Sequence, residues 1–137
     1  MSLASLVRRA LAEHEHQEAV YDLPVRKWYR GDAALDTSVS FHGDAASTPV
    51  GPAAGPHSQL AQNIALSWLG GARIIELKTV QIKDDLAIPR PCIDATNVGY
   101  NIEWSQELRV PQSLREYAKA WLLIHILREA GITKDLA

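Results

Sequence analysis

Sulfur and long apolar runs are scarce in this sequence. Cys92 is the only cysteine among 137 residues, so the chain can form no internal disulfide. A chelating metal site would have to be built from histidine, aspartate and glutamate. The longest apolar stretch, residues 120–127, is interrupted by His125 and is far shorter than the ~20 residues that a membrane helix needs. These absences favour a reducing, cytoplasmic setting and argue against a membrane protein.

The sequence also lacks an excess of charge of either sign. The 14 basic and 16 acidic residues include no long run of like charge, so the sequence offers no footprint for a phosphate backbone or an anionic lipid surface. Arg8 and Arg9 lie inside the only N-terminal apolar pattern, which argues against a signal peptide. We therefore expect neither nucleic acid nor membrane partners.

The first 47 residues predict a helix, an arm and a hairpin. Apolar residues recur at helical spacing from residue 3 to residue 11, which predicts a helix that ends near residue 14 or 16. The stretch 22–36 combines turn residues with two aromatic rings that need cover, which indicates an ordered arm packed on another part of the protein. Short strands at 39–41 and 47–50 flank a turn at 42–44, which is typical of a β-hairpin.

From residue 48 onward the pattern is strand, small-residue loop, helix, strand, long loop and helix. Helices are predicted at 60–69 and 113–130, a strand at 73–80, and no long element at 81–109. Two strand-loop-helix units in succession predict an α/β fold with parallel pairing and crossover helices. Two such strands close no sheet, so the sequence looks like the beginning of a larger α/β domain.

Three segments map to the carboxyl ends of these strands, where ligands gather in α/β proteins. The loop 49–55 has no long side chain and could lie against a flat ring, although a tight turn needs small residues too. Lys78 could donate to an anionic group with Glu76 beside it, or both could belong to a solvated strand face. The third segment, 94–101, is rich in asparagine and glycine, which are also ordinary turn residues.

Histidine and cysteine form no catalytic constellation. His125 is typical of a satisfied core histidine, and His57 of a residue that caps the helix after the loop. Cys92 has no histidine close in sequence and is typical of a small buried side chain. No catalytic triad or paired-carboxylate motif can be assembled.

Six specific motifs carry a family resemblance. They are TPVGPAAGPH at 48–57, QLAQNI at 59–64, SWL at 67–69, ELKTV at 76–80, PCIDA at 91–95 and EWS at 103–105. Through them the chain resembles the N-terminal region of the YgfK-type selenate reductase subunits from residue 48 to about residue 127. The first 47 residues match only loosely. Those proteins are large multidomain oxidoreductases, similar to dihydropyrimidine dehydrogenase and the small glutamate synthase subunit.

The resemblance implies a specific architecture. The first part of those proteins is similar to the FMN barrel of dihydroorotate dehydrogenases. Residues 1–47 would then form the N-terminal helix, arm and short β-hairpin, and residues 48–137 the first two strand-helix units of a TIM-type (β/α)8 barrel. The barrel would be incomplete, since a complete one needs roughly 250 residues.

The resemblance also implies site residues. In the wider family a loop with the pattern Asn-Pro-x-x-x-Ala-Ser/Ala-Gly ends the first strand against FMN, and this chain matches it at Pro49 and at 53–55. A lysine at the end of the second strand lies near flavin and substrate there, and Lys78 takes that place as the catalytic residue. The implied cofactor contacts are Ala53, Ala54, Gly55, Lys78 and Thr79.

A later loop of the family reaches the substrate through an asparagine. Asn97 or Asn101 could correspond, and the resemblance does not choose between them. Iron-sulfur clusters, FAD and NAD(P)H would be bound by later parts of the full-length protein, and Cys92 does not sit at the position of the family's catalytic base.

These residues lead to two hypotheses. In the first, the chain is an N-terminal fragment of a flavin-dependent, iron-sulfur-linked oxidoreductase and is inactive alone. Its partners would be a small-molecule substrate and the remainder of the full-length protein or other oxidoreductase subunits, with self-association through open sheet edges. In the alternative, it is a non-catalytic, truncated interaction module that completes its sheet with another chain.

Overall fold

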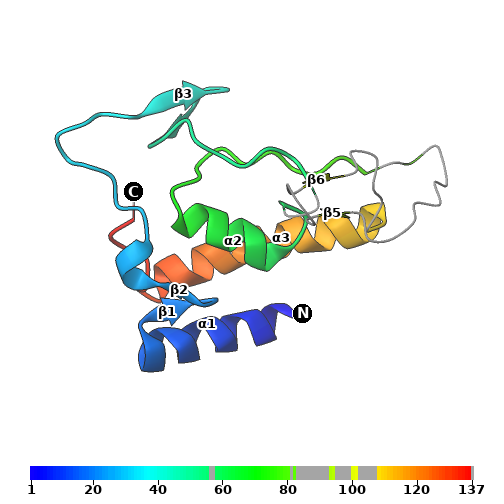
Figure 1. Ribbon diagram of the computed structural model, residues 1–137, viewed down its shortest axis with the longest axis horizontal. Helices are drawn as coiled ribbons and strands as arrows, with labels where there is room; N and C mark the ends of the chain where they lie inside the picture. The colour runs from blue at the N-terminus through cyan, green and yellow to red at the C-terminus, as the bar shows by residue number, and fades with distance from the viewer. Residues whose placement is uncertain (56–57, 81, 83–92, 95–99, 102–107, 137) are drawn as a thin grey trace.

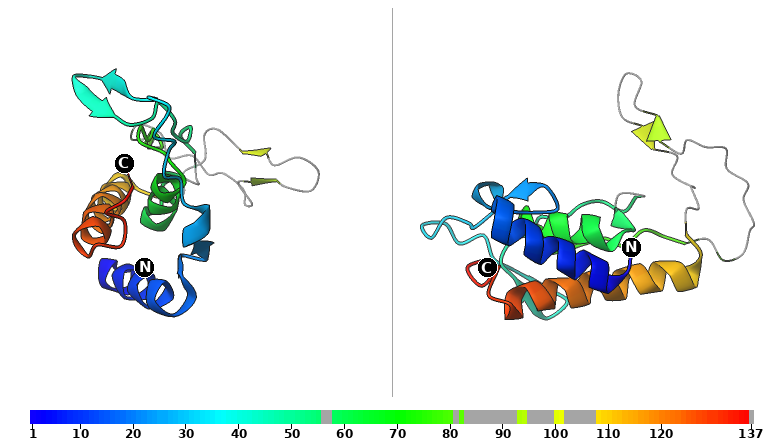
Figure 2. Two further views of the ribbon diagram at one scale, coloured as in Figure 1. Left: turned by 90° about the vertical axis from the view of Figure 1, so that its left-hand side faces the viewer. Right: turned by 90° about the horizontal axis from the view of Figure 1, so that it is seen from below.

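Three helices form the body of the protein. The computed structural model describes all residues except 56–57, 81, 83–92, 95–99, 102–107 and 137. The helices are α1 at Leu3–Gln17, α2 at Ala61–Leu69 and α3 at Val110–Glu129. Figure 2 shows them nearly end-on as the three corners of a triangle, and α3 contacts both of the others. No helix in the described part of the chain is long and apolar enough to cross a membrane.

The helix α1 is tied to the turn that follows it. Ser2 caps it by accepting the amide of Ser5 at 3.1 Å. Beyond its end, β1 at Ala19–Val20 pairs antiparallel with β2 at Leu23–Pro24 across Tyr21 and Asp22, which both have positive φ. The buried Glu13 carboxylate accepts the amide of Asp22 at 2.9 Å, which holds this turn against the helix.

The arm after β2 packs on the helices. It opens with a short 3-10 helix, η1 at Val25–Lys27, followed by Trp28, which is 5% exposed. The indole of Trp28 donates to the carbonyl of Leu23 at 3.2 Å, and the amide of Tyr29 donates to the carbonyl of Leu69 at the end of α2. The Trp28 ring is therefore covered, as predicted, whereas the Tyr29 side chain stays 39% exposed.

A hairpin projects from the helical body, but its second strand is not where the sequence predicted it (Figure 1). β3 at Val39–Phe41 pairs antiparallel with β4 at Asp44–Ala46. His42 and Gly43, both with positive φ, form a two-residue turn that sets Phe41 opposite Asp44. The predicted strand at 47–50 was therefore wrong, because the tight turn starts the returning strand three residues earlier.

The predicted strand at 73–80 was also wrong. Within the described residues, 47–50 and 73–80 contain no strand, although segments 48–55 and 72–80 run side by side in the same direction (Figure 1). Their backbones meet where the carbonyl of Val50 accepts the amides of Arg73 at 2.9 Å and Ile74 at 3.4 Å. A parallel ladder needs evenly spaced bonds along both segments, and bonds that converge on one carbonyl do not make one.

The chain comes unusually close to itself at this crossing. Gly51 lies against the carbonyl of Ile74 so tightly that a side-chain carbon on Gly51 would overlap the carbonyl oxygen. The small-residue loop therefore meets backbone, as its composition suggests, and that backbone belongs to the same chain.

The predicted α2 matches the structure closely, and its start is supported from α3. Leu60, the N-cap residue of α2, makes no side-chain capping bond, and the Glu116 carboxylate accepts the amide of Ala61 at 3.0 Å instead. Glu116 also pairs with Lys119, whose ammonium donates to the carbonyl of Met1 at 2.8 Å. Burial raises the pKa of Glu116, but the hydrogen bonds from Lys119 and Ala61 lower it by more. The pKa of Glu116 is therefore below its ordinary value.

The helix α3 begins three residues before the predicted residue 113. The side chain of Gln112 accepts the amide of Arg109 at 2.8 Å, and a proline lies in the first turn, which together favour an earlier start. Between α2 and α3, β5 at Ile93–Asp94 pairs antiparallel with β6 at Tyr100–Asn101. The three two-stranded sheets of the described chain are thus all antiparallel.

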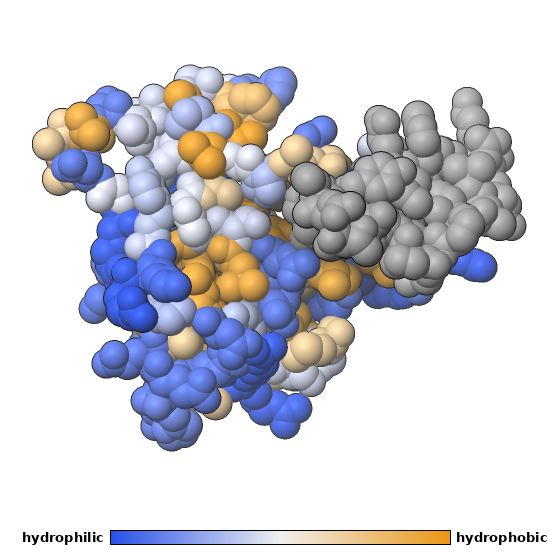
Figure 3. Space-filling model, in the orientation of Figure 1, coloured by the Kyte–Doolittle hydropathy of each residue, from blue (hydrophilic) through white to orange (hydrophobic). Residues whose placement is uncertain are grey.

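One hydrophobic core joins the three helices. Its fully buried apolar side chains include Val20, Leu69, Leu123 and Leu127, and Leu6 and Ala10 of α1 belong to the same cluster. In the space-filling view, apolar side chains gather over α2 and hydrophilic ones over α1 (Figure 3). The core therefore draws on both the N-terminal 47 residues and the rest of the chain.

Candidate functional site

The small-residue loop and the segment after α2 are joined by a charged hydrogen bond. The amide of Ala54 donates to the Glu76 carboxylate at 3.0 Å. Ser58 fixes the end of the loop, because its hydroxyl accepts the amide of Gly55 at 3.1 Å and bonds the carbonyl of the same residue at 3.0 Å. Residues 53–55 and 76–79 thus belong to one small region, although more than 20 residues separate Ala54 from Glu76 in the chain.

Lys78 is buried in this region, with 7% of its surface exposed. Its ammonium donates to the carbonyl of Thr79 at 3.2 Å, and its own carbonyl accepts the hydroxyl of Tyr117 from α3 at 3.0 Å. Burial raises the pKa of Tyr117, so this hydroxyl stays protonated and able to donate at neutral pH. Lys78 is therefore positioned by α3, while Thr79 remains exposed.

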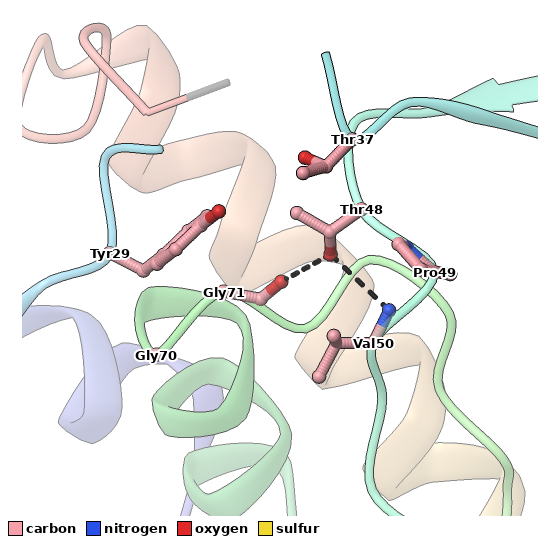
Figure 4. Close-up of a pocket in the computed structure, with 7 residues that line it drawn as sticks. All are labelled: Tyr29, Thr37, Thr48, Pro49, Val50, Gly70 and Gly71. Atoms are coloured by element: carbon pink, nitrogen blue, oxygen red, sulfur yellow. Dashed lines mark hydrogen bonds between the residues drawn. The ribbon is translucent and has the colours of Figure 1, made fainter. Parts of the chain in front are cut away.

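A cavity of about 380 Å³ lies at the other end of the two extended segments (Figure 4). The ring of Tyr29 and the backbone of Gly71 form one wall, and Thr48 and Val50 form the other. The Thr48 hydroxyl donates to the carbonyl of Gly71 at 2.8 Å and accepts the amide of Val50 at 3.4 Å. The cavity sits where the segments begin, whereas barrel enzymes place their chemistry where the strands end.

Comparison with known proteins settles the family. The family described as "Oxidoreductase YgfK, N-terminal TIM-barrel domain" matches residues 21–136. The chain belongs to this family. Two YgfK proteins, one from Escherichia coli strain K12 and one from Escherichia coli O157:H7, are each 47% identical to this chain over 122 residues. Their names assign both provisionally to the oxidoreductases.

The match covers most of this chain but a small part of each YgfK relative. It includes 89% of this chain but 12% of each relative, so the chain spans about an eighth of their length. No solved structure matches the chain. The match therefore establishes a TIM-barrel-type oxidoreductase domain as the family to which this mixed helix and sheet structure belongs.

Within the YgfK family assignment, the structure places the expected site residues as follows. Ala54 and Gly55 lie in the loop that Glu76 holds, and Lys78 and Thr79 follow Glu76 directly. Ala53 is exposed beside them. Asn101 lies in β6 opposite Ile93, while Asn97, His57 and Cys92 lie outside the described residues.

Two contacts were not predicted from the sequence. Glu76 was expected beside Lys78, but its carboxylate accepts the Ala54 amide. Tyr117 was assigned only to the apolar stripe of the last helix, and its hydroxyl reaches the carbonyl of Lys78. A tyrosine on an apolar stripe is itself a signal, because a buried tyrosine hydroxyl usually finds a hydrogen-bond partner.

Metal ligands do not cluster in the part of the chain that is described. No group of three or more histidine, cysteine, aspartate or glutamate side chains there could hold a metal ion. The exposed His125 packs edge to face on Trp121, with ring centroids 4.4 Å apart. The expectation that His125 is a satisfied core histidine was therefore wrong, since it lies on the surface.

Proposed function

We propose that this chain contributes an incomplete first part of an FMN-dependent (β/α)8 barrel in an iron-sulfur-linked oxidoreductase of the selenate reductase type, with the side-by-side segments 48–55 and 72–80 in the places of its first two strands. Membership of the YgfK family supports the oxidoreductase class. The observation that carries the flavin proposal is the hydrogen bond between Ala54 and Glu76, because it brings residues 53–55 and 76–79 together. These are the two segments that contact the flavin in barrels of similar sequence pattern.

The residues suit the ring of a flavin better than its phosphate. The loop at 53–55 offers backbone and methyl groups, against which a flat ring can lie closely. The Glu76 carboxylate that accepts the Ala54 amide would repel a phosphate, so the phosphate must be held by a different part of the barrel. Such an arrangement agrees with the general position of phosphate sites in these barrels, after the last strands.

Each residue then has a definite task. When bound, FMN supplies electron or hydride transfer between a donor and a small-molecule substrate. Ala53, Ala54, Gly55 and Thr79 hold the ring in place through backbone contacts. Lys78 keeps a positive charge in a buried position next to the loop, where it stabilises negative charge that develops on the ring or the substrate. Asn97 or Asn101 faces the substrate.

The chain alone supplies only part of the pocket. It spans 12% of the length of its relatives, and a flavin pocket in a barrel draws on loops after many strands. FAD, NAD(P)H and iron-sulfur clusters would be bound by the remainder of the full-length protein or by other oxidoreductase subunits. We expect no turnover and no tight FMN binding by the 137 residues on their own.

A chimera tests this proposal. The matched 122 residues of the Escherichia coli strain K12 relative are replaced by those of this chain, and the bound flavin per protein is measured by absorbance. The expected result is a chimera that retains the flavin content of the parent. A second chimera with Lys78→Gln should keep its flavin but show an altered flavin reduction potential, because a buried positive charge next to the ring is lost.

The control for the chimera is Arg26→Gln, which removes an exposed positive charge outside the candidate site. It should leave the reduction potential unchanged. A folded parent that contains no FMN, or a Lys78→Gln chimera with an unchanged potential, would contradict the flavin role.

The interaction module remains a second candidate because of one surface. Leu114 and Trp121 on α3 are 66% and 65% exposed, and large apolar side chains at this exposure are typical of contact surfaces. The flavin content of the chimera separates the two functions, because a purely structural module does not restore a flavin site, and titration of the isolated chain with FMN tests both. Stoichiometric micromolar binding by a monomer would show a self-sufficient flavin domain and exclude both an incomplete barrel and a purely structural module.

A further inference from the structure

A second cavity lies beside the base of the β3–β4 hairpin, over the C-terminal part of α3. Its volume is about 450 Å³. In Figure 1 the hairpin projects above the region where α3 ends and the C-terminus lies. The lining residues are Ser38, Ala45, Ala46, Ser47, Trp68, Arg73, Arg128 and Leu136. The two charged residues among them are both arginines.

Arg73 is held in a fixed position in this cavity. Its guanidinium carbon lies 5.0 Å from the centroid of the Trp68 ring, which is a cation-π contact. One of its terminal nitrogens donates to the carbonyls of Trp68 and Ala72, each at 2.9 Å. An arginine with so many restraints loses little conformational freedom when it binds an additional group.

Arg128 brings a second positive charge to the same cavity. It lies in the last turn of α3, where a cation is favoured by the helix dipole. Burial is the largest cause of the lowered pKa of Arg73, Tyr29 acts in the opposite direction, and the charge of Arg128 also lowers the pKa. Arg128 is exposed, so solvent screens the repulsion between the two arginines, and both of them line the same cavity.

The rest of the lining is compatible with an anion. Ser47 contributes a hydroxyl, which can donate a hydrogen bond. Two acidic residues close in sequence to the lining have partners of their own: Asp135 pairs with Arg30 at 2.9 Å, and Asp36 accepts the amide of Ser38 at 2.9 Å. Neither carboxylate is among the groups that line the cavity.

We propose that this cavity binds a phosphate group, either as inorganic phosphate or as part of a phosphate monoester. Two guanidinium groups match the charge of a phosphate dianion and its paired oxygens. The cavity lies by the amino-terminal ends of the extended segments, so it is separate from the Ala54 and Glu76 contact. The site therefore does not depend on the proposed flavin function.

Calorimetric titration of the purified chain tests the site. The probes are inorganic phosphate and glycerol 3-phosphate, with sodium chloride at matched ionic strength as the reference. We expect saturable binding of one phosphate per chain and none of chloride. Tighter binding of glycerol 3-phosphate would identify a phosphate monoester as the natural ligand, and equal or tighter binding of inorganic phosphate would identify the free ion.

Matched variants locate the binding. Arg128→Gln should weaken phosphate binding about tenfold or more, because one charged hydrogen-bond donor is lost. Arg115→Gln, an exposed arginine on the same helix, should bind like the wild type. Arg73→Lys is the second variant, and circular dichroism confirms that each variant folds. The proposal is overturned if the wild type gives no saturable heat with phosphate, or if Arg115→Gln and Arg128→Gln weaken binding equally.

Discussion

Replacement of Gly51 by alanine should be one of the most damaging single changes in this protein. The added methyl group would overlap the carbonyl oxygen of Ile74, and neither a Cβ atom nor a backbone carbonyl can move aside by a side-chain rotation. Relief requires separation of the two segments, which also weakens the bonds from Arg73 and Ile74 to the carbonyl of Val50. Overpacking of about 1–3 kcal/mol plus about 1 kcal/mol for a lost backbone hydrogen bond gives a loss of about 2–4 kcal/mol.

The assay is thermal unfolding followed by circular dichroism. For a domain of this size, such a loss lowers Tm by about 6–12 °C. Gly70→Ala is the matched control: Gly70 has ordinary helical dihedrals, and an added carbon there would lie 3.4 Å from the carbonyls of Leu66 and Ser67. Its Tm should change by only about 3 °C or less. Similar Tm values for the two variants would refute the close backbone contact at Gly51.

Three further changes have definite outcomes. Glu116→Gln should lower the free energy of unfolding by about 1 kcal/mol at pH 7. Because the pKa of Glu116 is lowered in the folded protein, the Glu116 carboxylate contributes to stability above about pH 4, and this contribution is lost below that pH. Urea unfolding should therefore converge for this variant and the wild type at low pH, whereas the exposed control Glu129→Gln should match the wild type throughout. Burial raises the pKa of Tyr21 to about 12, so its stabilising effect should persist to about pH 10 and decline as pH rises towards 12. Absorbance titration at 295 nm should show late ionisation of Tyr21 as well as of Tyr117, whose pKa burial also raises, and Tyr21→Phe should remove the Tyr21 contribution. If the α3 surface mediates self-association, Leu114→Gln with Trp121→Gln should lower the mass measured by light scattering without lowering helix content.

The helices could be predicted from the sequence because their signal is local. Apolar residues at helical spacing locate α1 and α2 to within a few residues, and the pair Gly70-Gly71 marks the end of α2. The last helix was predicted to begin too late, because its first turn is set by Pro111 and Gln112 rather than by apolar residues. Capping contacts of this kind decide a boundary without changing the apolar pattern.

The strands could not be predicted in the same way. Alternation at 73–80 predicts extended backbone correctly, but strand formation depends on neighbours that the local sequence does not encode. The hairpin shows the same limit, since His42 in positive φ fixes the register and histidine is not a strong turn signal. Family resemblance connected residues 53–55 with Lys78, whereas the contact between Ala54 and Glu76 depends on the path of the chain between them.

The position of α1 has a consequence for any shortened version of this protein. The family match begins at residue 21, inside the turn that Glu13 holds, and thus excludes the whole of α1. Yet the hydroxyl of Tyr21 donates to the carbonyl of Leu6 at 2.9 Å, and Leu6 itself is 2% exposed in the common core. A chain that started at residue 21 would lose this hydrogen bond and expose to water the apolar side chains that α1 covers. The border of the family match therefore falls inside the folding unit, and the boundaries of any shortened version should follow the packing rather than that match.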